Sequence, residues 1–188
     1  MSSHSEGILD LRADFQLFND LVERHFHQEL AVNDSGVLSY IAALLSDFAR
    51  VENLYKIRDA RGRRIEDVGE MLLESNPLLG APSFDRERQV RKHIGDFTLF
   101  FSGMFPESIR HWRFRQQRLD SFVDYVKAGK ESYYIVSEFN LFEYRKVAAL
   151  FRRLSDDFEM CVYGLNLVRR DLDFGRPRLT RQIQDIIN

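Results

Sequence analysis

The chain has 188 residues, of which 44% are hydrophobic and 30% are charged, and its formal net charge at pH 7 is −2. This composition is typical of a globular chain and excludes collagen-like and low-complexity sequence. The near-neutral balance excludes a global basic field of the kind that non-specific nucleic-acid binders use. The single cysteine excludes an internal disulfide framework and any zinc or iron–sulfur site that needs several cysteines.

The amino terminus is polar and has neither the basic region nor the apolar run of a secretory signal. The longest apolar runs, at 37–45 and 97–105, are far shorter than the roughly 20 residues that a membrane span needs. We therefore expect a cytoplasmic protein with no membrane partner. Residues 1–9 are expected to form a flexible tail and residues 10–188 a single domain, since one core usually serves roughly 100–200 residues.

Apolar residues recur at helical spacing along almost the whole chain. The first stripe predicts a helix over residues 10–30, and the second predicts a helix over residues 37–55. The turn between them contains Asp34 and Ser35, and either side chain is placed to cap the second helix.

Residues 56–64 form a basic stretch around a glycine, for which we expect a loop. A short third helix is predicted over residues 65–76, and the proline- and glycine-rich segment after it predicts a second loop. The stripe over residues 84–104 predicts a long fourth helix. Pro106 either ends this helix or begins the next one at its first turn.

Short apolar edges over residues 109–126 predict further helical segments, with Gly129 as their end. Residues 133–136 alone would suit a strand, but a lone strand has no pairing partner, so we expect them to begin a helix. The last stripe, over residues 142–173, predicts one helix of about 30 residues or two nearly collinear helices. Gly175 should then break the chain before a short tail.

These patterns predict an all-α fold, a single-domain helical bundle or irregular helical array of about seven to nine helices. No internal period of the length found in repeat arrays is present, so a solenoid is not expected. Far-UV circular dichroism should accordingly show a helical signal without a dominant strand signal.

Two carboxylates fall on apolar stripes when successive residues are turned by 100° around the predicted helices. They are Glu29 in the first helix and Glu52 in the second. One hypothesis is that they hold a metal ion or a proton inside the bundle. We favour the alternative, a frayed helix end at Glu29 and an interior arginine or tyrosine partner for Glu52, because structural ion pairs outnumber sites. Glu52→Ala should then cost roughly 3–5 kcal/mol of stability.

A di-iron or di-manganese centre in a bundle requires two Glu-x-x-His pairs, and the sequence contains none. The nearest approaches are His25 with Glu29 and Glu107 with His111, each four residues apart. We therefore expect no metal and no cofactor. The candidates that remain for a metal site are His25, Glu29 and Glu52. A metal- or cofactor-binding helical-bundle enzyme would use Glu29 and Glu52 together with His93 and Asp96.

His93 and Asp96 lie three residues apart on the fourth helix, at the margin of its apolar stripe. A carboxylate one turn away can fix the tautomer of a histidine, as general-base pairs require. No Gly-x-Ser-x-Gly motif accompanies them, and Cys161 lies inside an apolar stripe. We favour a histidine that is hydrogen-bonded at the edge of the core. Gly95, in the same helix, is expected to admit a crossing helix rather than a flat ligand.

Positive charge is concentrated in two segments, residues 56–64 and residues 110–118. The second interleaves arginines with aromatic residues, which suits phosphates combined with base stacking. Arginine also pairs with carboxylates, so the same residues suit ion pairs. We do not expect a nucleic-acid partner, because no recognition motif is present. The candidates for anion binding are Arg110, Arg113, Arg115 and Arg118.

The sixteen phenylalanines exceed what a small bundle core needs, and aromatic residues and arginine are enriched at the centres of protein interfaces. We therefore expect a non-catalytic interaction or assembly module. Its partner would be another protein or a second copy of the chain, and we expect a homodimer at micromolar concentration. The alternatives are a helical-bundle enzyme and a protein that binds anions or nucleic acid through residues 110–118.

Overall fold

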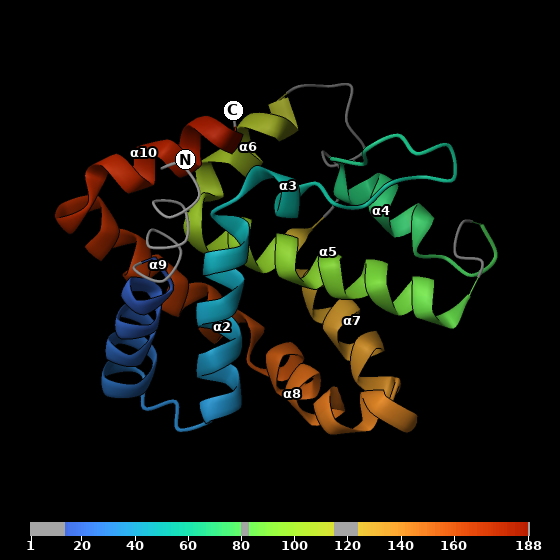
Figure 1. The fold of residues 1–188 in the computed structure, drawn as a ribbon, viewed down its shortest axis with the longest axis horizontal. Helices are drawn as coiled ribbons and strands as arrows, with labels where there is room; N and C mark the ends of the chain where they lie inside the picture. Colours follow the sequence, from blue (N-terminus) through green and yellow to red (C-terminus); the bar gives the residue numbers. More distant parts are fainter. Residues whose placement is uncertain (1–13, 80–82, 115–123, 188) are drawn as a thin grey trace, which may run out of the picture.

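The computed structural model describes residues 14–79, 83–114 and 124–187. These residues form an all-α irregular helical array, as predicted (Figure 1). In these three ranges the β-type pairing is limited to an isolated bridge between Arg58 and Arg64. None of the described helices combines the length and the apolar character needed to span a bilayer. The tail expected at residues 1–9 lies outside the described ranges.

The first helix changes its winding before it ends. Residues 14–22 are α-helical, and the π-helix η1, Glu23–Glu29, continues them to a turn at Leu30. A π-helix bonds residue i to i+5 and therefore holds more residues in each turn than an α-helix. The side chains change phase across η1, so a projection at 100° per residue misplaces this segment.

Helix α2, Ser35–Phe48, begins as predicted. The Asp34 carboxylate caps it by accepting hydrogen bonds from two backbone N–H groups of its first turn, at 2.8 and 3.1 Å. The predicted continuation of this helix to residue 55 is wrong. The backbone at Arg50 is extended, with φ −117° and ψ 128°, and α3, Val51–Leu54, follows as a separate short helix.

Residues 56–66 form a hairpin-shaped loop that leads to α4, Val68–Glu74. The third helix is therefore shorter than predicted, and Ile65 belongs to the loop. Helix α5, Phe84–Met104, has the predicted bounds. It crosses the middle of the molecule and is buried along most of its second half (Figure 1).

Pro106 occupies the first position of α6, Pro106–Phe114, so it begins a helix. Helix α7, Tyr125–Glu138, continues through Gly129, and the helix end predicted there is wrong. Residues 133–136 are helical, as expected, but they lie in the second half of α7. A short 3-10 helix, η3 (Phe142–Tyr144), follows.

The last long stripe forms two helices, α8 (Arg145–Asp156) and α9 (Phe158–Gly175), which separate at Asp157. The tail predicted after Gly175 is instead a helix, α10, Pro177–Ile187. Its buried residues include Ile183 and Ile187, which join the hydrophobic core. The apolar face of α10 is thus covered by the rest of the fold, which explains why this segment is helical.

Two interior glycines set how closely the central helices approach. A Cβ at Gly95 of α5 would lie 2.4 Å from the ring of Tyr133 on α7. A Cβ at Gly129 of α7 would lie 2.3 Å from the ring of Phe158 on α9. Real side chains do not approach so closely, so these positions admit glycine alone without rearrangement. The predicted role of Gly95 in close helix packing is confirmed.

Candidate functional site

Asp96 is a buried carboxylate, 2% exposed, in the middle of α5. Its Oδ1 accepts hydrogen bonds from the hydroxyls of Tyr40 at 2.5 Å and Tyr133 at 2.8 Å. Its Oδ2 accepts from the Lys92 ammonium at 2.6 Å. The donors belong to α2, α7 and α5, so one carboxylate joins three helices.

The electrostatics of this cluster keep both phenols protonated. Burial, followed by the charge of Asp96, raises the pKa of Tyr40 and of Tyr133 well above the ordinary value. Three donors therefore occupy the Asp96 carboxylate, and a general base would have to give up one of them to take a proton from a substrate. The cluster holds the helices in register, and its geometry is that of a satisfied polar network.

His93 lies one turn before Asp96, but the two residues share no hydrogen bond or ion pair. The Nε2–H group of His93 instead donates to the backbone carbonyl of Leu54 at 2.9 Å, which fixes the tautomer. Within the described ranges its Nδ1 has no hydrogen-bond partner. Burial and then the charge of Lys56 lower the pKa of His93 to about 4. The ring is therefore neutral at pH 7, and the hypothetical base pair with Asp96 does not form.

His25 is 5% exposed and lies between two carboxylates. Its Nε2 is 3.0 Å from Oδ2 of Asp171 on α9, in hydrogen-bond geometry. Its Nδ1 is 3.0 Å from Oε1 of Glu29, but the angle falls outside that of a hydrogen bond. Asp171 also pairs with Arg24 at 2.9 Å. This group fastens η1 to α9.

Glu29 and Glu52 are both exposed, so their predicted positions on buried stripes are wrong. The wider turns of η1 move Glu29 off the stripe, and the extended backbone before α3 breaks the register that would have placed Glu52. Glu107 lies 3.3 Å from Arg169 and has no ion pair with His111. Among the residues that the structure describes, no three His, Cys, Asp or Glu side chains are placed to hold a metal ion.

The segment predicted to bind anions is described only in part. Arg110 is exposed on α6, whereas the side chains of Arg113, Arg115 and Arg118 lie outside the described part of the chain. The aromatic residue between them, Trp112, is buried, with its ring 4.8 Å from that of Phe101. Trp112 is thus part of the core and is not available for base stacking.

The other basic segment is a loop, as expected, and it is folded back on itself as a hairpin. The Ile65 N–H donates to the Ile57 carbonyl at 2.9 Å, and the Asp59 N–H donates to the Arg63 carbonyl at 2.9 Å. Gly62 turns the chain with φ +80°, a conformation that favours glycine. We call residues 56–66 the basic hairpin.

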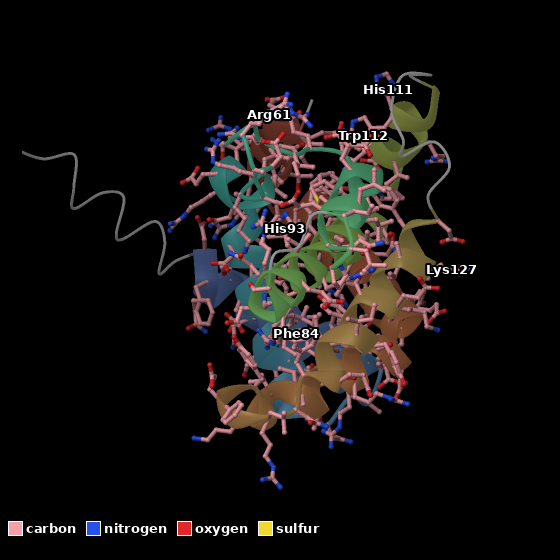
Figure 2. All side chains as sticks on the ribbon, turned by 90° about the vertical axis from the view of Figure 1, so that its right-hand side faces the viewer. Arg61, Phe84, His93, His111, Trp112 and Lys127 are labelled. Carbon is pink, nitrogen blue, oxygen red and sulfur yellow. The ribbon has the colours of Figure 1, made fainter. Side chains whose placement is uncertain are left out.

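Large apolar side chains are exposed on several segments at one end of the molecule, and Figure 2 views this end and labels Phe84 among them. They come from α4 and the α4–α5 connection, the start of α5 and the α7–α8 connection. The hydroxyl of Tyr144 donates to Asp85 at 2.8 Å and so holds these segments together. We call this surface the apolar end; it consists of Leu73, Leu78, Leu79, Phe84, Leu141 and Phe142.

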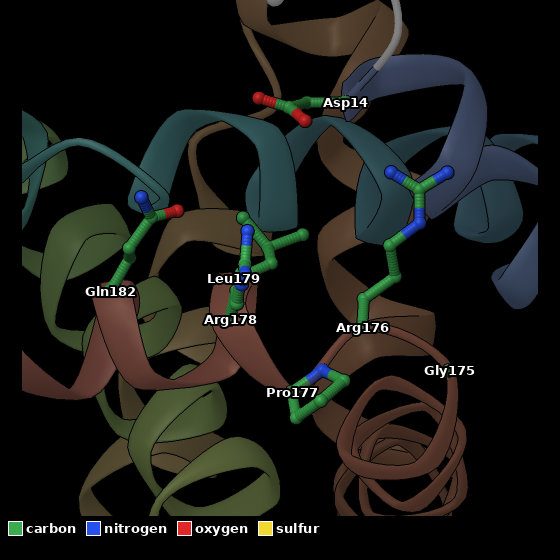
Figure 3. A pocket seen from close by; sticks show the side chains of 7 residues that line it. All are labelled: Asp14, Gly175, Arg176, Pro177, Arg178, Leu179 and Gln182. Carbon is green, nitrogen blue, oxygen red and sulfur yellow. The ribbon is translucent and has the colours of Figure 1, made fainter.

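A pocket of about 470 Å³ lies where α9 meets α10 (Figure 3). Its lining includes Asp14, Arg176, Arg178 and Gln182. The lining also contains Gly175 and Pro177, which connect the two helices. The lining comes from the α9–α10 junction, the first half of α10 and Asp14 of the first helix, and it contains none of the candidate residues predicted above.

No family model, curated protein or solved structure matches this chain. The function is therefore inferred from geometry. The Asp96 network, His93 and the His25 group join elements of the fold to one another. The apolar end presents large apolar side chains to solvent, and the basic hairpin presents a local group of cations.

Proposed function

We propose that this chain is a protein-interaction module that self-associates through its apolar end. The observation that carries this proposal is Phe142, whose side chain is 87% exposed and whose backbone has φ +50°. A left-handed backbone at a bulky residue costs of order 1–3 kcal/mol. Solvent exposure of the ring forgoes the transfer free energy of burial as well. Residues that break local rules in this way are expected at functional surfaces.

The other residues of the apolar end support a protein interface. Phe84 is 75% exposed and Leu78 is 91% exposed, and monomeric proteins rarely expose contiguous apolar patches larger than a few hundred Å². Glu143 and Lys146, exposed charges of opposite sign, follow Phe142 closely in sequence. A polar rim around an apolar centre is typical of protein interfaces.

A second copy of the chain is the partner that this surface favours. A two-fold contact brings the same patch of each copy together, so one apolar surface is sufficient to form a dimer. Opposite charges on the rim allow Glu143 of one copy to approach Lys146 of the other. The surplus of phenylalanine in the sequence is consistent with this use, since Phe84 and Phe142 lie outside the core.

The mass of the full chain in solution tests the proposal. Sedimentation velocity or light scattering at several micromolar concentrations should show a dimer. Combining Phe84→Ser with Phe142→Asn should raise the dissociation constant at least about tenfold, which corresponds to about 1.4 kcal/mol. The matched control is Phe174→Ser, because Phe174 is also 87% exposed but lies at the end of α9.

The control variant should retain the mass of the wild type. A wild-type chain that is monomeric throughout the micromolar range would disprove self-association. An equal loss of dimer in the Phe174→Ser variant would place the interface elsewhere.

A further inference from the structure

The basic hairpin has two faces, because side chains alternate along a strand. Ile57 and Ile65 point inward and are 1% and 2% exposed. Arg58 and Arg64 occupy the positions between, and both are exposed. Hydrophobic anchoring on the inner face therefore fixes which arginines face solvent.

Arg58 and Arg64 lie directly opposite each other in the bridge. The backbone hydrogen bonds on either side of them make this a non-hydrogen-bonded pair, the type in which opposing side chains come closest. Like charges in directly opposite positions destabilise a strand pair. Among the residues that the structure describes, neither guanidinium forms an ion pair with a carboxylate, and Arg58 donates only to the Gly62 carbonyl, at 3.1 Å.

The neighbouring Arg63 is neutralised, in contrast. Its guanidinium pairs with Asp59 at 3.0 Å and with Glu70 of α4 at 2.8 Å. The Asp59 carboxylate also accepts from the backbone N–H groups of Arg61 and Arg63, both at 2.9 Å. The hairpin is thus fastened through one arginine, while the opposed pair remains free to bind a ligand.

The chemistry of an opposed arginine pair favours phosphate. A phosphodiester has two unesterified oxygens, and each of the two arginine forks can donate to one of them. Alternation along the strand places Lys56 on the same face as the pair, roughly 6.7 Å away, with Glu66 opposite it in the register of the bridge, and Arg61 is exposed at the tip. A row of cations of this kind suits a chain of phosphates better than a single one.

We propose that the outer face of the basic hairpin binds the phosphodiester backbone of a nucleic-acid strand. Arg58 and Arg64 converge on one phosphate, and Lys56 and Arg61 contact its neighbours. The hairpin carries no aromatic residue, so the contact is to the backbone and is independent of base sequence. The chain as a whole is nearly neutral and has no global positive field. The cations of the basic hairpin attract the phosphates locally.

The tip of the hairpin also distinguishes this ligand from a membrane. Ala60 and Gly62, which flank Arg61, supply no large apolar side chain for insertion into lipid. The hairpin could therefore bind an anionic lipid surface only through its charged side chains. The experiment therefore includes anionic vesicles as a separate arm.

Fluorescence anisotropy of the full chain with a labelled oligothymidylate and with a labelled DNA duplex, each of about 20 nucleotides per strand, tests the proposal. Both probes should bind at about 50 mM salt and weaken steeply toward about 200 mM. Arg58→Gln with Arg64→Gln should lower affinity at least about tenfold at the lower salt. The slope of log K against log salt should fall by about 0.7–0.9, because the two arginines together contact one phosphate.

The matched control is Arg170→Gln with Arg181→Gln, which removes two exposed charges from α9 and α10. It should change affinity by less than about twofold, since charges outside the site contribute only through the screened field. Arg61→Gln should lower the slope by about 0.7–0.9, for one phosphate contact. This single variant keeps the test available if the double variant folds poorly.

The urea midpoint of the Arg58→Gln, Arg64→Gln variant separates a binding role from a structural one. It should equal or exceed that of the wild type, since a like-charge pair is removed. A lower midpoint would assign the pair a structural role and overturn the proposal. Equal losses of affinity in both double variants would also overturn it. So would the absence of salt-dependent binding of either probe, or tighter binding to anionic vesicles.

Discussion

At the residue scale, the Asp96 carboxylate accepts hydrogen bonds from the Tyr40 and Tyr133 hydroxyls, which belong to α2 and α7. Asp96→Asn keeps the shape but removes the charge that these donors bind. We expect this substitution to lower the free energy of unfolding by about 2–4 kcal/mol, because buried hydrogen bonds to a charge are strong and Lys92 also loses its partner. Urea unfolding of the variant and the wild type, with equal slopes, measures the effect.

Glu52→Gln is the matched control for this prediction, since it makes the same chemical change at an exposed carboxylate. It should alter stability by no more than about 0.5 kcal/mol. The larger loss predicted from the sequence for Glu52→Ala assumed burial, and the exposed position of Glu52 removes that premise. Equal effects at Asp96 and Glu52 would contradict the network described here.

His93 makes stability depend on pH. The folded ring has a pKa of about 4, below the ordinary value of 6.5, so only the unfolded chain takes up this proton between those two values. The neutral, buried His93 ring contributes fully to the free energy of unfolding above about pH 6.5. This contribution is lost as the pH falls toward about 4, and the total loss is about 3 kcal/mol.

Urea unfolding at several pH values between about 4 and 7 measures this loss. His93→Gln retains an N–H donor for the Leu54 carbonyl and removes the titration, so its stability should vary less with pH. His111→Gln, at an exposed histidine, should keep the dependence of the wild type. An unchanged dependence in His93→Gln would assign the effect to other groups.

At the scale of elements, the close approach of α5 and α7 depends on Gly95. Alanine is the better helix former by about 1 kcal/mol, but its Cβ would lie 2.4 Å from the Tyr133 ring. We expect Gly95→Ala to be destabilising by about 1–3 kcal/mol, because overpacking outweighs the gain in propensity.

Gly175→Ala provides the comparison for Gly95→Ala. Gly175 ends α9, and a Cβ there meets no atom within 4 Å. This substitution should be neutral or stabilising by up to about 1 kcal/mol, because it restricts the unfolded chain. Thermal or urea midpoints of the two variants measure the contrast. A destabilised Gly175→Ala variant with an unaffected Gly95→Ala variant would refute the packing account.

At the scale of the whole molecule, self-association couples stability to concentration. A dimer is stabilised by mass action, so the thermal midpoint of the wild type should rise with protein concentration. The midpoint of the Phe84→Ser, Phe142→Asn variant should not. Asparagine tolerates the left-handed backbone at position 142 better than phenylalanine, so the isolated subunit should be no less stable than the wild-type subunit.

Much of the secondary structure could be predicted from interactions between residues that are close in the sequence. The 3.6-residue period predicted an all-α structure and the bounds of α5, and the Asp34 cap and the position of Pro106 also followed from local chemistry. These features depend on residues a few positions apart, which a single sequence displays directly. The same reasoning failed at Gly129, because helix propensity does not show that a neighbouring helix requires the glycine.

Tertiary structure alone decided which candidate residues meet. Asp96 was visible as a candidate, but its phenol partners lie 56 and 37 residues away along the chain, and periodicity carries no information about such pairs. Glu52 was misplaced because one extended residue at the end of α2 reset the helical phase. The opposition of Arg58 and Arg64 likewise exists only in the register of the hairpin. The sequence by itself determined which functional groups the chain contains. The path and register of the backbone determined which of these groups lie next to one another.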